Sequence, residues 1–507
     1  MTGGSPGLML RAGGTLRLLV LVVALLSVTA GIASAGSGSA RRSARSARNP
    51  PWFPSLMASE HYDSARTKVF AQAQFTGSFV RANVVKAHTS RDDYLTPYNV
   101  VYRDAHSMFV YGGGFGDKGG TGSFVARVNP STLRTVWFNQ LINTEQTNEW
   151  DYPGVVAILR DGDLYLIYGY RLAKLDPSNG HVLAQVVLPT PAAPRDTSYN
   201  GFDALPDGTL IAKAVYRQAG CEEQGFTAFT NCKDPTDVPN SLIVAINPRT
   251  LAVIAEIQAP QLVVGRITTV RFRGKDYIYL AGSSQIFRYR YAGGHLSLDS
   301  TWGPVTYLTP GSGQTNASAV VVMNDWVVFA DNGKPVTQRD LPSPWLSVMA
   351  VNQADASKTF VIQPFKAFRS GPRYPVSFCP SAVSVDPARN EIFVLDAGPG
   401  RIASLQLRSD GLHTVWSERQ RTTEFLALIG PSARRVVVGT EIPFGERLGK
   451  NKLDRVVWRV AATGRELARS RLLPAILNGS MVQPGYAGRM YYLQVDKLIE
   501  LSVSPKT

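Results

Sequence analysis

Residues 172–180 read LAKLDPSNG, a short, mostly apolar run followed directly by a turn. Related stretches occur at 124–130 (FVARVNP), 243–248 (IVAINP) and 457–464 (VWRVAATG). Short apolar runs bounded by turn residues are typical of buried β-strands. The turns form readily, because proline presets φ and asparagine or glycine accepts a positive φ. Each stretch therefore predicts a strand that ends in a tight turn.

Strand-like runs of this kind recur from residue 68 onward, and two kinds of turn separate them. Turns of the first kind, such as Arg160-Asp161-Gly162 and Pro206-Asp207-Gly208, occur eight times, about 55 residues apart. Turns of the second kind, such as the one within 172–180, occur seven times. Repeats of four antiparallel strands around an axis are typical of a β-propeller. The sequence predicts an all-β propeller with eight blades, and seven blades is the alternative.

The two ends of the repeat array indicate how the ring closes. The last unit, Ser480 to Val503, offers three strands and then the chain ends. Val69 to Thr76 (VFAQAQFT) is a strand-like run without a repeat of its own. We expect this N-terminal strand to complete the last blade.

The N-terminal residues differ in composition from the repeats. Arg11 and Arg17 precede the apolar stretch 18–28, and Ala33-Ser34-Ala35 follows it, as in a secretory signal peptide. An uncleaved anchor is the alternative, although the apolar stretch is shorter than a membrane-spanning helix. We expect a signal peptide at 1–35, a basic Ser/Ala/Arg-rich linker and lead-in at 36–66, and one propeller domain at 67–507.

The formal charge of +15 is unevenly distributed. Residues 1–48 hold six arginines and no acid, which leaves +9 on the rest of the chain. No basic helix or aromatic-basic module of a nucleic-acid-binding domain is present, so we expect no nucleic-acid partner. The arginine tail suits contact with an anionic envelope surface, and membrane contact is expected only through this tail or an uncleaved signal.

The three cysteines are expected to play two different roles. Cys221 and Cys232 lie in one loop-like insertion and predict a local disulfide in an oxidising compartment. Cys379 is left over, either as a buried free thiol or as a reactive or intermolecular one.

Four of the strand-turn stretches, at 124–130, 172–180, 243–248 and 457–464, resemble the quinoprotein-like (PQQ-repeat) propellers. The resemblance implies the fold and says little about activity, because propellers carry many unrelated functions. The quinone-dependent dehydrogenases of that group have adjacent cysteines beside the cofactor, and this chain has none, so bound PQQ is not expected. A fainter resemblance, through Tyr199-Asn200-Gly201-Phe202, is to the gluconolactonase-like propellers, which implies a divalent cation on the axis.

In a propeller, ligands bind on the face formed by the loops into the innermost strands and by the loops between second and third strands. We call this the top face, and the opposite one the bottom face. The histidines fall mainly in bottom-face turns, so we expect them to be solvated. Aromatic and charged residues in the top-face loops suit a sugar or an anionic aromatic ligand, and the ligand-binding candidates are Trp150, Asp151, Tyr152, Tyr199, Arg266, Lys334, Arg339, Arg373 and Tyr374.

Oxygen-bearing side chains in the same loops could hold a hard cation such as Ca²⁺. The alternative is that they satisfy backbone groups of their own loops. The metal candidates are Glu149, Asn200, Asn316, Glu424 and Asn478, of which Glu149 and Glu424 are also the candidate catalytic residues.

Two functions remain open from the sequence. The first is an exported binding protein, secreted or associated with the cell envelope, whose top face takes an extracellular small molecule, a glycan or a protein partner. The second is a cation-dependent hydrolase or lactonase with a metal on the axis. Whether the chain is an enzyme stays open, no cofactor is certain, and we expect a monomer.

Overall fold

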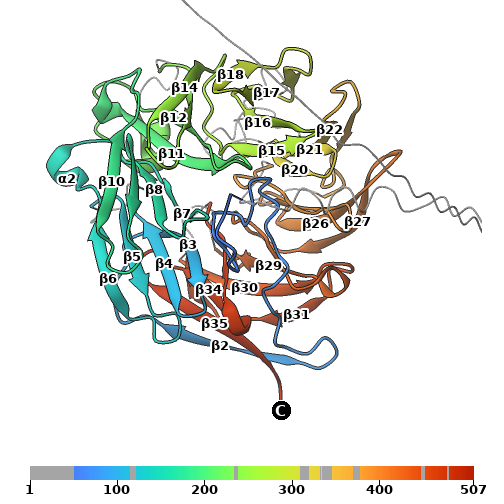
Figure 1. Ribbon diagram of the computed structural model, residues 1–507. Coiled ribbons are helices and arrows are strands. Elements are labelled where there is room, and N and C mark those ends of the chain that lie inside the picture. Colours follow the sequence, from blue (N-terminus) through green and yellow to red (C-terminus); the bar gives the residue numbers. More distant parts are fainter. Residues whose placement is uncertain are drawn as a thin grey trace, which may run out of the picture. The chain divides into compact units, whose positions relative to one another are not determined.

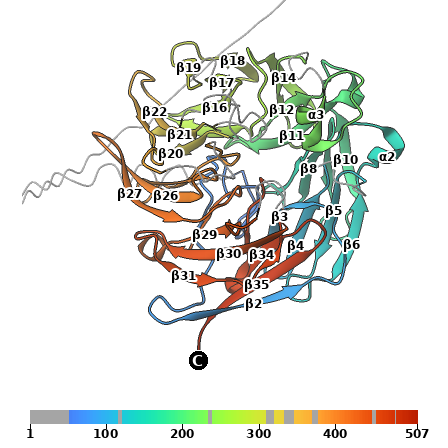
Figure 2. The same ribbon diagram turned by 180° about the vertical axis from the view of Figure 1, so that it is seen from behind.

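The structure is a computed structural model that describes residues 51–114, 121–232, 238–308, 319–331, 333, 345–368, 377–446, 452–476 and 479–507. One compact unit spans Asn49–Thr507. Within this unit, eight antiparallel sheets stand in a ring (Figure 1), which is seen from behind in Figure 2. The all-β propeller with eight blades is therefore confirmed.

Blades 1 to 4 are each formed by consecutive strands, given from the axis outward. Blade 1 holds β3 (Pro97–Asp104), β4 (Ser107–Gly112), β5 (Phe124–Val128) and β6 (Thr135–Gln140). Blade 2 holds β7 (Val155–Ile158), β8 (Leu164–Tyr168), β9 (Arg171–Leu175) and β10 (Val182–Val187). Blade 3 holds β11 (Thr197–Ala204), β12 (Leu210–Tyr216), β13 (Leu242–Ile246) and β14 (Val253–Gln258). Blade 4 holds β15 (Thr268–Phe272), β16 (Lys275–Ala281), β17 (Gln285–Ala292) and β18 (His295–Leu298), and β19 (Val305–Thr306) adds to β17.

Blades 5 to 7 repeat this order, and blade 8 is composite. Blade 5 holds β20 (Val321–Met323), β21 (Trp326–Ala330), β22 (Val348–Asn352) and β23 (Thr359–Ile362). Blade 6 holds β24 (Ser384–Asp386), β25 (Glu391–Asp396), β26 (Arg401–Arg408) and β27 (Gly411–Arg419). Blade 7 holds β28 (Ala427–Ile429), β29 (Val436–Glu441), β30 (Leu453–Val460) and β31 (Glu466–Arg469), with β32 (Leu473–Pro474) on β30. Blade 8 holds β33 (Gln483–Pro484), β34 (Met490–Leu493), β35 (Leu498–Pro505) and, as its outermost strand, β2 (Asn83–Thr89).

The burial pattern of the strands follows their distance from the axis. Strand β11 is buried along all eight residues and β8 along all five, because neighbouring blades cover both faces of these inner strands. The fourth strand β14 alternates between half-buried and exposed residues, because one of its faces is open to water. The core therefore lies between the blades and around the axis.

The ring closes through an N-terminal strand, as expected, but the strand is not Val69–Thr76. Strand β2 pairs antiparallel with β35 from Asn83↔Pro505 to Thr89↔Ile499. Val69–Phe70 forms β1, which pairs in parallel with β28 on the axial side of blade 7. The physical reason is burial: both residues of β1 are buried, whereas β2 alternates as an outermost strand must.

The helices among the described residues are all short. They are α2 (Thr144–Thr147), α3 (Ala228–Asn231) and the 3₁₀ turns η2 (Pro194–Asp196), η3 (Gly225–Thr227), η4 (Ser432–Arg434) and η5 (Tyr486–Gly488). Within the described ranges, no helix has the length and apolar character that crossing a bilayer requires.

Candidate functional site

We call residues 51–76 the axial segment, and residues 56–70 of this segment lie inside the ring of blades. Figure 1 shows this part of the chain in blue at the centre of the ring. The compact unit to which this segment belongs begins at Asn49. Leu56, Met57 and Phe70 of this segment are buried among core residues of the blades.

The axial segment forms hydrogen bonds with every blade in turn. Carbonyl groups of the segment accept from backbone N–H groups of the innermost strands of six blades, at 2.7–3.1 Å: Met57 from Tyr102, Ala58 from Ile158, Ser64 from Thr269, Ala65 from Val322, Thr67 from Val385 and Lys68 from Leu428. Ser64 Oγ donates to the carbonyl of Ala204 in blade 3 at 2.8 Å. The Tyr486 hydroxyl in blade 8 accepts from Leu56 N at 3.1 Å.

The backbone of the segment turns sharply at four residues that are not glycine. His61, Tyr62, Arg66 and Lys68 have φ values of 63°, 82°, 58° and 62°. Side chains other than glycine rarely adopt this left-handed region, and each such residue is disfavoured by roughly 1–3 kcal/mol. The conformation persists because the contacts with the surrounding blades determine it.

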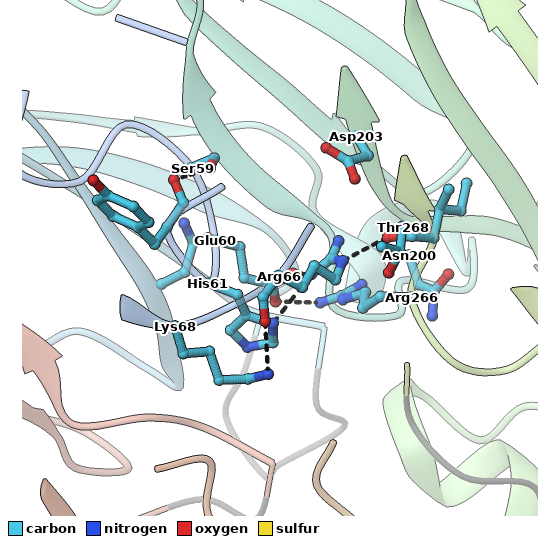
Figure 3. A network of polar contacts seen from close by, with 12 residues as sticks. Ser59, Glu60, His61, Arg66, Lys68, Asn200, Asp203, Arg266 and Thr268 are labelled. Carbon is cyan, nitrogen blue, oxygen red and sulfur yellow. Dashed lines mark hydrogen bonds and ion pairs between the residues drawn. The ribbon is translucent and has the colours of Figure 1, made fainter. Parts of the chain in front are cut away.

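Glu60 is the centre of a buried charged cluster on the axis (Figure 3). Its carboxylate accepts from Arg66 Nη1 at 2.8 Å, from Arg266 Nη2 at 3.1 Å and from the Tyr98 hydroxyl at 2.5 Å. Burial alone would raise the pKa of Glu60, but the positive charges around it, Arg266 foremost, outweigh burial and hold the pKa well below its usual range. Glu60 is therefore ionised and neutralises part of the arginine charge.

His61 and Lys68 extend the cluster toward blades 6 and 7. Burial lowers the pKa of His61 well below its usual value, so the ring is neutral, and its Nδ1 lies 3.1 Å from Arg66 Nη1. Because the guanidinium can only donate, this nitrogen is the acceptor. Lys68 Nζ donates to the carbonyls of Val383 at 2.7 Å and Arg66 at 3.1 Å. Burial, and then repulsion by Arg66, lowers the pKa of Lys68 to about 7.

Blade 3 contributes a second buried lysine. Lys213 Nζ donates to Asn200 Oδ1 at 2.6 Å, and Asn200 Nδ2 donates to the carbonyl of Val264 at 2.7 Å. Burial lowers the pKa of Lys213 far below its usual value, and Arg266 and Arg66 add repulsion. Asp203, which Figure 3 also shows, accepts from Thr269 N at 2.9 Å, and burial raises its pKa to about 7. Near neutral pH the cluster thus carries more positive than negative groups.

Several predicted ligand-binding residues are buried in the structure. Trp150 is fully buried, and its indole N–H donates to the carbonyl of Gly225 at 3.1 Å. Its ring and that of Tyr152 lie 5.4 and 5.2 Å from Phe229, in an insertion that the Cys221–Cys232 disulfide closes. This disulfide matches the expected pairing. The insertion thus covers the top-face residues of blade 2.

Other candidates are also engaged within the propeller. Asp151 is buried, and burial raises its pKa to about 6. Tyr199 is buried in the core and its hydroxyl donates to the carbonyl of Pro189 at 2.7 Å. Arg266 belongs to the axial cluster and donates to the carbonyl of Pro153 at 2.9 Å. The remaining candidates, Lys334, Arg339, Arg373 and Tyr374, lie outside the described residues.

The predicted metal candidates that are described have separate partners. Glu149 binds Arg171 at 2.8 Å, Asn200 binds Lys213, and Glu424 accepts from Ser480 N at 2.7 Å. Burial raises the pKa of Glu424 well above its usual value. Asn316 and Asn478 lie outside the described residues. In the part of the chain that the structure describes, no group of three His, Cys, Asp or Glu side chains converges as a metal site would require.

The fainter resemblance implies a divalent cation on the axis, and the described axial residues do not fit such a cation. The axial segment occupies these positions, and its cationic side chains already bond to carbonyls and to Glu60. A divalent cation needs several oxygen ligands with negative charge, whereas this cluster has excess positive charge.

His61 departs from the expectation that the histidines are solvated. It is buried at 2% exposure, whereas His88, His106, His181 and His295 are exposed and His413 is half-buried. Sequence reasoning also missed Glu60, Arg66, Lys68 and Lys213. The sequence feature that could have indicated this cluster is the density of charged residues in 60–68, shortly after the apolar residues Leu56 and Met57.

Comparison with known proteins adds information about the fold. No protein-family model matches the chain, and no curated protein matches it. A quinohemoprotein alcohol dehydrogenase from Pseudomonas putida HK5 superposes with a TM-score of 0.51, at 11% sequence identity, over 93% of this chain and 83% of that chain. The fold is that of an eight-bladed quinoprotein-like propeller.

Two other solved structures are similar at lower TM-scores. BamB from Moraxella catarrhalis has a TM-score of 0.47 at 12% identity, over 83% of this chain and 100% of that chain. Apo AztD from Citrobacter koseri has a TM-score of 0.43 at 11% identity, over 79% of this chain and 97% of that chain. At these identities the likeness concerns the fold alone.

Proposed function

We propose that this quinoprotein-like propeller is an exported protein that binds an extracellular partner on its top face. The observation that carries the proposal is the axial segment, which fills the centre of the ring and is bonded to all eight blades. A ligand held on the axis would have to displace these contacts. A protein or glycan that spans several top-face loops would not.

The place where the chain enters the ring also favours the top face as the binding face. Arg160, in a bottom-face turn, donates its N–H to the carbonyl of Pro51 at 3.1 Å, and Arg103 stacks on the ring of Phe53. Residue 51 therefore lies on the bottom face. A tether or anchor attached through the N-terminal residues would leave the top face open to a partner.

Two features support export. The apolar stretch 18–28 followed by small residues is typical of a signal peptide. The disulfide between Cys221 and Cys232 is of a kind that persists in oxidising compartments and is rare in the cytosol. N-terminal sequencing of the protein recovered outside the cytoplasm tests this part of the proposal, and we expect the mature chain to begin after Ala35.

Photo-crosslinking in the native host tests the choice of face. A photoreactive phenylalanine analogue replaces Arg195, whose side chain is 61% exposed in a top-face loop. The matched control carries the analogue at His181, which is exposed in a bottom-face turn. We expect a discrete crosslinked partner from position 195 and none from 181. A partner captured only from position 181 would contradict the proposal.

The alternative function is the cation-dependent hydrolase. It has less support, because Glu149 is paired with Arg171 and the raised pKa of Glu424 favours its uncharged form, which is a poor metal ligand. Metal analysis and thermal melts with and without a chelator separate the two functions. Stoichiometric Ca²⁺ whose removal lowers the melting temperature would favour the hydrolase.

A further inference from the structure

The top end of blade 6 places two arginines directly opposite each other. Strands β26 and β27 are antiparallel neighbours, and their register pairs Arg401, the first residue of β26, with Arg419, the last residue of β27. Like charges at directly opposed positions of a sheet destabilise it. Such a pair lowers the stability of the folded protein unless a negatively charged group neutralises it.

Other charged cross-strand pairs in this propeller are neutralised within the chain. Arg271 and Asp276 are opposed on β15 and β16 and bind each other at 2.8 Å. Asp386 and Glu391, also in blade 6, form a second like-charge pair, but each has its own arginine. Asp386 binds Arg435 and Glu391 binds Arg389, both at 2.8 Å.

Arg401 and Arg419 have no such neutralising group. Neither forms an ion pair with any residue that the structure describes. Two acids, Asp396 and Glu418, lie in the same sheet but do not neutralise the pair. Asp396 lies opposite Arg401 on β25, but its carboxyl group binds Ser377 Oγ and the N–H groups of Phe378 and Gly398. Glu418 favours the charged form of Arg401 but does not contact it as an ion pair.

Aromatic rings hold the two guanidinium groups in place. Arg401 lies 3.6 Å from the ring centroid of Phe368, and Arg419 lies 4.2 Å from that of Phe444. The guanidinium group of Arg421 lies 4.3 Å from the same Phe444 ring. Stacking uses the faces of the guanidinium groups and leaves their N–H edges as donors. Arg401 also donates to the carbonyl of Ser417 at 3.1 Å, which further limits its movement.

We propose that the top end of blade 6 binds a tetrahedral oxyanion, a phosphate or a sulfate group, between Arg401 and Arg419. Guanidinium groups recognise such anions through paired, charge-assisted N–H donors. The anion would supply the negative charge that no described acidic side chain places beside this pair. Burial lowers the pKa of Arg401, and the charge of Arg419 lowers it further. A bound anion would offset this repulsion. The inference rests on the proposed binding function, since it names the ligand chemistry of one part of the top face.

Isothermal titration calorimetry on the mature full-length protein tests the proposal. The probes are inorganic phosphate, inorganic sulfate and glucose 6-phosphate, in a chloride buffer of constant ionic strength. We expect Arg401→Gln and Arg419→Gln each to weaken binding roughly tenfold, because each removes charge-assisted hydrogen bonds. Tighter arginine-dependent binding of glucose 6-phosphate identifies an ester as the natural ligand, whereas equal binding identifies the free anion.

The matched control is Arg408→Gln, which removes the same charge from the exposed bottom end of β26 and should leave binding unchanged. Thermal melts show whether the variants fold. Without anion, we expect the melting temperatures of Arg401→Gln and Arg419→Gln to equal or exceed that of the unmodified protein, because each substitution removes repulsion. Absence of binding by the unmodified protein, or equal affinity in the double variant, would overturn the proposal. The crosslink from position 195 does not depend on this site, so its persistence would leave the proposed function standing.

Discussion

At the residue scale, Glu60 has the clearest energetic role. It is buried between two arginines and a tyrosine, so its removal leaves buried positive charge without a partner. We expect Glu60→Gln to lower the free energy of unfolding by about 3–5 kcal/mol. Urea unfolding at pH 7 measures this, with Glu256→Gln on the exposed outer strand β14 as the control. Equal midpoints for the two variants would contradict the assigned role.

Lys68 gives the stability of the protein a specific pH dependence. Its pKa in the folded protein is about 7, against 10.5 in its unperturbed state. Between these values the unfolded chain binds more protons than the folded one, so the stability contribution of Lys68 rises from pH 7 to 10.5 and is lost again as the pH falls from 10.5 to 7. We expect Lys68→Met to reduce this rise, measured as the difference in urea midpoint across the window, whereas the depressed pKa of Lys213 maintains the remainder. Lys86→Met, at an exposed position, should retain it, and an unaltered slope in Lys68→Met would be incompatible with the depressed pKa.

The axial residues also show where sequence reasoning reaches its limit at this scale. The Cys221–Cys232 disulfide was predictable, because both cysteines lie in one short insertion. Glu60 and His61 were not, because their partners include Arg266 and Phe425, far away in sequence. Nothing local in a charged stretch distinguishes a solvated loop from a segment that the rest of the chain encloses.

At the scale of elements, β2 determines whether the ring closes. Its half-buried residue Val85 packs against the main core cluster, while the neighbouring Lys86 is exposed. A charge at position 85 would have to be buried at the seam between the two chain ends. We expect Val85→Asp to lower the free energy of unfolding by about 2–3 kcal/mol, whereas Lys86→Asp changes it little. Urea unfolding followed by circular dichroism compares the two, and similar losses would mean that β2 is not a closing strand.

The strands themselves were largely predictable, and the closing strand was not. Turn signals such as Asp176-Pro177 and Pro206-Asp207-Gly208 act locally, so their number indicated eight blades correctly. Val69–Thr76 and Asn83–Thr89 are both short runs of similar length that contain apolar residues. Which of them pairs with β35 depends on the space around the axis, and this is a property of the closed ring.

At the scale of the whole molecule, the axial segment links all the blades. A chain that begins at residue 49 keeps the segment and should melt like the mature protein. A chain that begins at residue 77 keeps β2 but loses buried Leu56, Met57 and Phe70, and we expect it to lose on the order of 5 kcal/mol or more. Differential scanning calorimetry of both chains measures the effect. Addition of a synthetic peptide of residues 49–76 should restore stability, and identical melting of the two chains would show that the segment is dispensable.

The same segment also determines the order of events when the protein folds. Leu56 bonds to Tyr486, 430 residues later in the chain, so the part that is synthesised first waits for a partner that is synthesised near the end. Contacts of such high sequence separation slow folding and expose unfinished intermediates to aggregation. In the export that we propose, the chain would cross the membrane with its N-terminal part leading and would reach its native state only after the last blade has emerged. Chaperones that hold the N-terminal residues in an extended form should therefore increase the yield of the folded protein.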